Sequence, residues 1–409
     1  MKRLLLIAFC FAFQFVTAQT DSGDLEIYLN AHISAMPGDS GNDYKTPTNA
    51  ELTTWGNCIT ALLSNDLVTA RAQADLVNYQ IVEYTNTALS ENKDFYVLEE
   101  KSTQTNYWGV FVFAKTPTRN QLVIQAPHSS FDFNTGKEAV YSFVRLNNKA
   151  LFLNGTHRCN HSTASTCAGT TTVCSGGGSE PFKISDMAHN SDSIWQKTTE
   201  LLNDSSTVFI QLHGFTKQAS DPYVILSNGT DKTPTTDYAT LIKNELFNQD
   251  NTLTFKIAHI DTWTRLVGFT NTQGRLINNS VNPCSNSATA TTGRFIHIEQ
   301  EKSKLRQDAT GWEKMYQTLN TVFTSTLSTK DVNRVKMLSK NPFTNEIKFS
   351  IDGVKSIAII NVLGKRYYNS HNKNKKSQFS IDTSNYPTGI YLLRISTESG
   401  MIYKKLIRE

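Results

Sequence analysis

Apolar and polar positions alternate in two different ways along this chain of 409 residues. Between residues 105 and 325, short apolar runs are separated by segments with helical spacing. Such runs predict buried strands, and strands alternating with helices are typical of an α/β fold with a mostly parallel sheet and helices on both faces. The predicted strands are 107–113, 122–124, 207–212, 253–258 and 294–298, and the predicted helices are 193–202 and 314–324. Residues 24 to about 95 predict a mostly helical lead-in.

The pattern changes near residues 328–333. From residue 335 onward, apolar and polar residues alternate in short runs that are separated by turn residues such as Asp352-Gly353 and Ser399-Gly400. This spacing predicts a small all-β sandwich of about 70 residues. The chain therefore divides into a catalytic-type α/β domain over 19–325, a linker over 326–337 and the β-sandwich over 338–409.

The N-terminus has the composition of a signal peptide. Lys2 and Arg3 precede an apolar run from Leu4, and the small residues of Val16-Thr-Ala18 follow. This order predicts cleavage after residue 18 and export of the remaining chain. No later segment is apolar enough to predict a membrane span. The net charge of +4 is too small to indicate a nucleic-acid partner.

Export makes disulfide bonds possible. Five cysteines follow the predicted signal peptide: Cys58, Cys159, Cys167, Cys174 and Cys284. Cys159, Cys167 and Cys174 lie in one polar loop. We expect disulfides that staple this loop, with one thiol left free or paired between chains. A zinc knuckle that includes His157 and His161 is the alternative, although the spacing matches no common C-x₂-C pattern.

Polar residues that can bind a metal follow several predicted strands. His128 follows the predicted strand 122–124 and precedes a glycine-containing loop to Glu138, and His213 and Glu299 each follow a later strand. Sheets of this kind place their sites at strand ends, and a hydrolytic zinc site needs three protein ligands and a nearby carboxylate. We therefore predict His128, Glu138 and His213 as metal ligands, with Asp132 as the alternative to Glu138. Each residue taken alone could instead have a structural role.

Arginine side chains are candidates for contact with a substrate carboxylate, because guanidinium binds carboxylate through two parallel hydrogen bonds. Arg275 and Arg306 are the first candidates and Arg158 is the next, although an ordinary surface role is the alternative for each. His189 and His297 are weaker candidates for the site. His297 and Glu299 are two residues apart on one strand and should share a face.

The first domain resembles zinc amidohydrolases of the N-formylglutamate amidohydrolase and poly-γ-glutamate hydrolase type. The resemblance rests on Pro127-His128, Thr135-Gly-Lys-Glu138, His213-Gly214 and Ile296-His-Ile-Glu299, with Arg306 seven residues further on. It implies a zinc-carboxypeptidase-like fold, one Zn²⁺ ion bound by His128, Glu138 and His213, and Glu299 as general base or acid. The chain departs from the family at Ser129-Ser130 and in the cysteine loop 154–180.

The last domain resembles the type A C-terminal sorting domain of the Bacteroidota type IX secretion system. The matching segments are Asn341-Pro342, 360–365, 381–393 and the basic terminus Lys404-Lys-Leu-Ile-Arg408. The resemblance implies that the secretion machinery is a partner and that the protein reaches the cell surface or the medium. A substrate-binding sandwich is the alternative role for this domain.

Together these patterns predict a secreted, zinc-dependent hydrolase that cleaves an amide bond in a carboxylate-bearing substrate. Peptidoglycan, γ-glutamyl polymers and peptide fragments are the candidate substrates. Two other functions remain open: a metal-dependent phosphoester hydrolase, and a metal-free cell-surface binding protein without activity.

Overall fold

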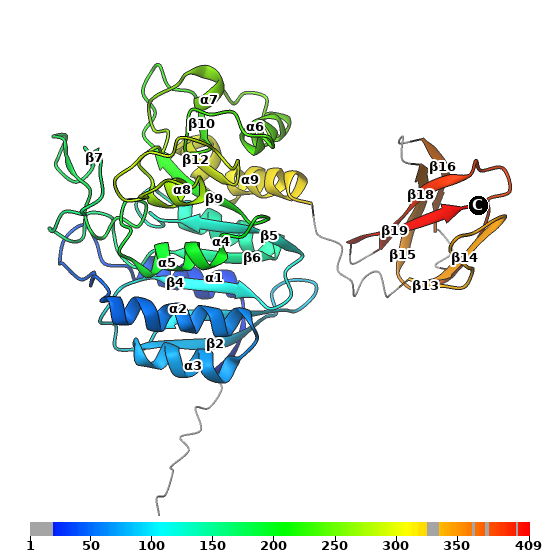
Figure 1. The fold of residues 1–409 in the computed structure, drawn as a ribbon, viewed down its shortest axis with the longest axis horizontal. Helices are drawn as coiled ribbons and strands as arrows, with labels where there is room; N and C mark the ends of the chain where they lie inside the picture. The colour runs from blue at the N-terminus through cyan, green and yellow to red at the C-terminus, as the bar shows by residue number, and fades with distance from the viewer. Residues whose placement is uncertain (1–18, 325–334, 362–364, 373–375, 398–399) are drawn as a thin grey trace, which may run out of the picture. The chain divides into compact units, whose positions relative to one another are not determined.

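The computed structural model describes residues 19–324, 335–361, 365–372, 376–397 and 400–409. The chain divides into a first unit that ends at Thr324 and a second unit that begins at Ser325 (Figure 1). The predicted signal peptide and most of the predicted linker lie outside the described residues. The last linker residues, Lys336 and Met337, form strand β13 of the second unit.

A 10-stranded sheet forms the centre of the first unit. In spatial order its strands are β1 (Gln19–Gly23), β2 (Tyr79–Asn86), β3 (Lys93–Glu100), β4 (Val110–Ala114), β6 (Asn148–Leu153), β5 (Arg119–Ala126), β9 (Val208–Phe215), β12 (Phe295–Glu301), β10 (Val224–Ser227) and β11 (Phe255–Ile257). Strands β6, β5, β9 and β12 are parallel neighbours in the middle, and β1–β2 and β10–β11 are also parallel pairs. The predicted mostly parallel sheet is confirmed, with antiparallel pairs toward its edges.

Helices cover both faces of this sheet (Figure 1). One face packs against α1 (Leu25–Ser34), α4 (Thr135–Leu146), α6 (Tyr238–Gln249) and α9 (Ala309–Val322), and the other against α2 (Asn49–Leu63), α3 (Leu67–Leu76), α5 (Ile194–Leu202) and α8 (Thr272–Ile277). Neighbouring residues of β5 enter different cores: Leu122 and Ile124 lie in the first, and Val123 in the second. A period of two along the central strands therefore assigns each side chain to one face.

Local signals explain where several helices begin. Ser193 caps α5 by accepting a hydrogen bond from the backbone N–H of Gln196, and Thr48 and Glu51 form a capping box at the start of α2.

The prediction of a helical lead-in as far as residue 95 is wrong beyond α3. Residues 79–86 alternate buried aromatic and β-branched side chains with partly exposed ones, and they form strand β2 between β1 and β3.

The second unit is made of two antiparallel sheets. One contains β13 (Lys336–Met337), β14 (Glu346–Ser350) and β17 (Gln378–Asp382), and the other contains β16 (Arg366–His371), β15 (Val354–Asn361), β18 (Gly389–Thr397) and β19 (Gly400–Arg408). Their apolar residues form one core that includes Phe349, Ile359 and Leu393. The predicted small all-β domain is confirmed.

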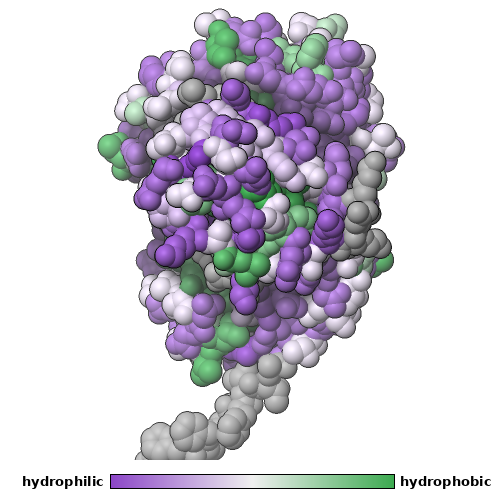
Figure 2. Space-filling view, turned by 90° about the vertical axis from the view of Figure 1, so that its right-hand side faces the viewer, coloured by the Kyte–Doolittle hydropathy of each residue, from purple (hydrophilic) through white to green (hydrophobic). Residues whose placement is uncertain are grey.

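The face in Figure 2 is largely hydrophilic, with hydrophobic residues in small separate patches. Within the described parts of the chain, no helix is both long and apolar enough to cross a membrane.

Two disulfides fasten the loop that follows β6. Cys159 is bonded to Cys174, and Cys167 is bonded to Cys284, while Cys58 is a buried free thiol. The prediction of disulfides with one thiol left over is confirmed. A zinc knuckle does not fit, because all three cysteines of the loop are used in disulfide bonds.

We predict that the chain from residue 19 onward has one thiol that reacts with iodoacetamide after denaturation without reductant. That thiol is Cys58, which its burial protects in the folded protein. Mass spectrometry of the alkylated protein and of its peptides would measure this. A second alkylated cysteine, or a peptide that joins Cys58 to another cysteine, would contradict the pairing.

Candidate metal centre

Polar side chains of the site lie on one face of three neighbouring strands. β5, β9 and β12 are adjacent and parallel, so their carboxyl ends meet at one edge of the sheet. Backbone register places Gln125 beside Gln211 and Gln211 beside His297, and two residues further on it places His213 beside Glu299. Because alternate residues of a strand share a face, these five side chains lie on the same face. That face is the one covered by α5 and α8.

Asp132 and two histidines come together at this edge. His128 Nδ1 lies 3.2 Å from Asp132 Oδ2, and His213 Nδ1 lies 3.4 Å from the same oxygen. A tetrahedral zinc ion with bonds of about 2.0–2.1 Å to nitrogen and oxygen separates its ligand atoms by roughly 3.3 Å. All three residues are almost fully buried. The spacing and chemistry of these atoms therefore fit a zinc ion.

The outer ring nitrogens of both histidines have polar partners. His128 Nε2 lies 3.0 Å from Asp186 Oδ1, and His213 Nε2 lies 3.1 Å from Gln211 Oε1. Metal-binding histidines are commonly oriented in this way by a second hydrogen bond. Burial is the largest cause that lowers the pKa of both histidines, so the rings are neutral at neutral pH, which is the form that binds a metal.

Sequence reasoning missed Asp186. Its carboxylate lies between His128 and His189, with Asp186 Oδ2 3.2 Å from His189 Nδ1. Although burial alone would raise the pKa of Asp186, the two histidines hold it well below its usual range. The one available signal was its position three residues before His189, a residue already considered for the site.

Glu138 does not lie with the two histidines, although the sequence predicted it as a ligand. It belongs to the first turn of α4, which packs on the opposite face of the sheet. There its Oε2 accepts a hydrogen bond of 2.7 Å from Nε2 of Gln300, the residue after Glu299, which therefore points to the other face. Burial raises the pKa of Glu138 to about 8. Asp132, the predicted alternative, is the carboxylate next to the histidines.

Glu299 lies on the correct face and beside the cluster. Ligand-type atoms of His213, His297 and Glu299 lie within 4.8 Å of one another. Glu299 is buried, and its Oε2 has no hydrogen-bond partner within the protein. Burial raises the pKa of Glu299 to about 7, against the opposing effect of the positive charge of Arg158. A carboxylate with this pKa is suited to accept and return a proton near neutral pH.

The two arginines that were the first candidates for substrate contact donate hydrogen bonds to backbone carbonyl groups instead. Arg306 donates to the carbonyl oxygens of Gln300, Phe133 and Phe215, and a Cβ atom on Gly214 would lie 2.1 Å from its guanidinium carbon. This close packing explains why residue 214 is a glycine. Arg275 donates to the carbonyl oxygens of Phe269, Pro283 and Cys284. Neither arginine lines the cleft that contains His128, His213 and Glu299.

A cleft of about 530 Å³ opens beside the cluster. His128, His213, His297 and Glu299 line its floor together with Arg158, which pairs with Asp132 Oδ1. Its walls are residues 170–173, Thr264 and residues 266–270. The Cys167–Cys284 disulfide and the hydrogen bonds of Arg275 fasten the segments next to these walls. Of the predicted arginines, Arg158 is the one that can reach a substrate in this cleft.

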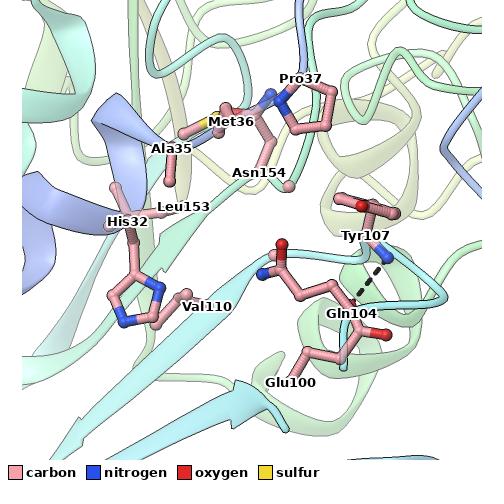
Figure 3. Close-up of a pocket in the computed structure, with 12 residues that line it drawn as sticks. His32, Ala35, Met36, Pro37, Glu100, Gln104, Tyr107, Val110, Leu153 and Asn154 are labelled. Carbon is pink, nitrogen blue, oxygen red and sulfur yellow. Dashed lines mark hydrogen bonds between the residues drawn. The ribbon is translucent and has the colours of Figure 1, made fainter. Parts of the chain in front are cut away.

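A second cavity lies between the end of α1 and the loop before β4 (Figure 3). Its volume of about 40 Å³ has room for little more than one or two water molecules. The carboxylate of Glu100 in its wall accepts hydrogen bonds from the backbone N–H groups of Thr105, Asn106 and Tyr107. This cavity therefore has neither the size nor a free reactive group for catalysis.

Comparisons with known proteins concern the two units separately. Among solved structures, the chain is similar to an N-formylglutamate amidohydrolase from Ralstonia eutropha JMP134, with 10% identity over 52% of this chain and 94% of that one and a TM-score of 0.29. It is also similar to a protein from Shewanella amazonensis SB2B described as a candidate metallopeptidase, with 12% identity over 65% and 92% of the two chains and a TM-score of 0.27. Among curated proteins, no relative matches the sequence. Residues 341–409 match the family model described as "Secretion system C-terminal sorting domain", so the second unit carries the sorting domain that the sequence motifs predicted.

Proposed function

We propose that this protein is a secreted, zinc-dependent hydrolase that cleaves an amide bond. The observation that carries the proposal is that ligand-type atoms of His128, Asp132 and His213 lie within 4.8 Å of one another, while both histidines and Glu299 line one cleft. Three ligands and a separate carboxylate are what a hydrolytic zinc site requires. The donor set of two imidazoles and one carboxylate suits zinc.

His128, Asp132 and His213 would hold the ion. When bound, zinc acidifies water and polarises a carbonyl group. Asp186 and Gln211 orient the two histidines through their outer nitrogens. The side chain of Asp132 is held in place by the backbone N–H of Gly214 at 3.1 Å and by Arg158.

Glu299 is the residue that moves the proton. Its carboxylate takes a proton from the attacking water and passes it to the nitrogen of the leaving amine, as general base and then general acid. Burial raises the pKa of Glu299 to about 7, which brings its ionisation near neutral pH. Glu299 lines the cleft, and no hydrogen bond within the protein occupies its Oε2.

The charges of the cleft favour an amide over a phosphoester. Asp132, Asp186 and Glu299 place three carboxyl groups around the centre, and Arg158 is the one arginine among the residues that line the cleft. A bound zinc ion and Arg158 would offset part of this negative charge, and the remaining repulsion is larger for a phosphate dianion than for a neutral amide whose single carboxylate contacts Arg158. Arg158 lines the cleft, so its guanidinium can contact a substrate carboxylate as well as Asp132.

The site of action follows from the second unit. A sorting domain at 341–409 implies recognition by the type IX secretion machinery and delivery to the cell surface or the medium. Peptidoglycan stems, γ-glutamyl polymers and peptide fragments are carboxylate-bearing amides found outside the cell membrane. We propose these as the substrate class.

Asp132→Asn and Glu138→Gln form a matched pair that identifies the carboxylate ligand. We expect D132N to weaken zinc binding by more than about 100-fold, because loss of an outer hydrogen-bond partner alone costs about 10- to 100-fold. E138Q should bind one zinc ion per chain as tightly as the wild type. Metal analysis and competition with a chelating dye would measure both. Zinc loss in E138Q with retention in D132N would reverse the assignment, and a wild type without bound metal would refute the metal centre.

Glu138→Gln should also remove a pH dependence of stability. Glu138 keeps its proton in the folded protein up to a pKa of about 8, whereas in the unfolded chain a glutamate loses it near a pKa of about 4.3. The contribution of Glu138 to the unfolding free energy at low pH is therefore lost as pH rises from about 4.3 to 8. We expect the unfolding free energy of E138Q, relative to the wild type, to increase between pH 5 and pH 8 in urea titrations. A constant difference across this range would show that Glu138 is ionised in the folded protein.

Glu299→Gln should separate metal binding from turnover. We expect E299Q to retain zinc and to lose about 10²- to 10⁴-fold in kcat, the usual contribution of general acid–base catalysis. The substrate panel should contain γ-glutamyl peptides, muramyl peptides and phosphoesters, tested with the zinc-loaded wild type. Hydrolysis of an amide substrate that E299Q does not cleave would support the proposal. Turnover of phosphoesters alone would refute the amide specificity, and full activity of E299Q would refute the role of Glu299.

A further inference from the structure

We propose that Gln211 is a positioning residue that fixes the tautomer of His213, so that Nδ1 rather than Nε2 is available to a metal. This inference deepens the proposed function and rests on it for its consequence, the affinity for zinc. Its structural basis is a network of buried amide side chains beneath the cleft. Gln125, Gln211, Gln273 and Gln196 are 0–3% exposed, and Asn271 is 1% exposed.

Gln211 occupies the centre of this network. Its Oε1 lies 3.1 Å from His213 Nε2 and accepts a hydrogen bond of 2.7 Å from Asn271 Nδ2. Its Nε2 donates to Oε1 of Gln125 at 2.9 Å and to Oε1 of Gln273 at 2.8 Å. Both acceptor positions of Oε1 and both N–H groups of Nε2 therefore have a partner.

Backbone groups set the direction of the network, because their donor and acceptor roles cannot be exchanged. The N–H of Gly274 donates to Asn271 Oδ1, so Asn271 turns its NH₂ group toward Gln211. The carbonyl oxygen of Met187 accepts from Gln273 Nε2, so Gln273 turns its oxygen toward Gln211. A flipped Gln211 amide would face a donor with its NH₂ group and an acceptor with its oxygen. The oxygen of Gln211 is consequently held toward His213.

An amide oxygen can only accept a hydrogen bond, so the proton of neutral His213 must reside on Nε2. The lone pair of the ring then belongs to Nδ1, which lies 3.4 Å from Asp132 Oδ2. The opposite tautomer would place unprotonated Nε2 against Gln211 Oε1, two acceptors 3.1 Å apart at the shorter contact of the ring, whereas the proposed tautomer leaves the longer contact, Nδ1 to Asp132 Oδ2, as the gap that a metal ion would fill. The network thus prepares His213 for the metal before the metal arrives.

Three substitutions separate this role from a purely structural one. Gln211→Met removes the acceptor toward His213 and fills a similar volume. Gln211→Glu keeps an acceptor toward His213 but places its second oxygen against Gln273 Oε1, which Met187 prevents from turning. Gln125→Met is the matched control, since it removes a partner of Gln211 on the side away from His213. All three variants should lower the unfolding free energy.

The zinc affinity of the purified full chain should depend on whether residue 211 offers His213 a hydrogen-bond acceptor, and not on the unfolding free energy of the variant. We expect Q211M to weaken zinc binding by about 10- to 100-fold. Q211E and Q125M should bind zinc within a few-fold of the wild type, although both are destabilised. Competition with a chelating dye and urea unfolding of the same samples would measure the two properties. Unchanged zinc affinity in Q211M, or an equal loss in Q125M, would overturn the proposal.

Nitrogen-15 NMR of the metal-free wild type tests the tautomer without relying on a foldable variant. With labelled histidine, His213 should show a protonated Nε2 and an unprotonated Nδ1 at neutral pH. A protonated Nδ1 would overturn the inference. Because this measurement needs no metal, it also distinguishes the two proposals: a wild type that binds no zinc but has this tautomer contradicts the proposed function and leaves the role of Gln211 intact.

Discussion

The carboxylate of Asp132 is the contact on which the candidate site depends. Its Oδ2 lies near ring nitrogens of His128 and His213 and accepts a hydrogen bond from the N–H of Gly214, and its Oδ1 pairs with Arg158. One buried side chain thereby joins the loop after β5 to strand β9 and to the cysteine loop. A buried carboxylate is stable only when such partners compensate for lost hydration. The position of each partner is set by this requirement.

The two faces of the central sheet divide the polar residues into two groups with different roles. On the face of α5 and α8, His213 and Glu299 meet the cleft, supported by the buried amides. On the face of α4, Glu138 contacts Gln300, and Arg306 binds backbone carbonyl groups. The chain can place both groups within one strand because adjacent residues point to opposite sides. Glu299, which lines the cleft, and Gln300, which binds Glu138, are therefore consecutive in sequence but lie on opposite faces of the sheet.

Export and the architecture of the cleft are related through the disulfides. The cleft wall at 170–173 lies in a loop that Cys159–Cys174 and Cys167–Cys284 tie down, and such bonds persist in oxidising surroundings. A sorting domain at 341–409 directs the chain to such surroundings. Arg275 binds carbonyl groups on both sides of the same region, at Phe269 and Cys284. The wall of the cleft is thus fixed by covalent and hydrogen bonds together.

The sequence by itself determined the parts that depend on local order: the buried strands, the mostly parallel sheet, the small β domain and its sorting motifs, and the histidines near strand ends. Periodicity and turn residues are local properties, so they can be recognised without coordinates. Tertiary structure alone decided that Asp132 and not Glu138 lies beside the histidines, that Asp186 contacts His128, and that Arg158 and not Arg275 or Arg306 lines the cleft. The physical reason is that a loop may turn a side chain to either face of a sheet, and which face it takes depends on packing between segments far apart in the chain.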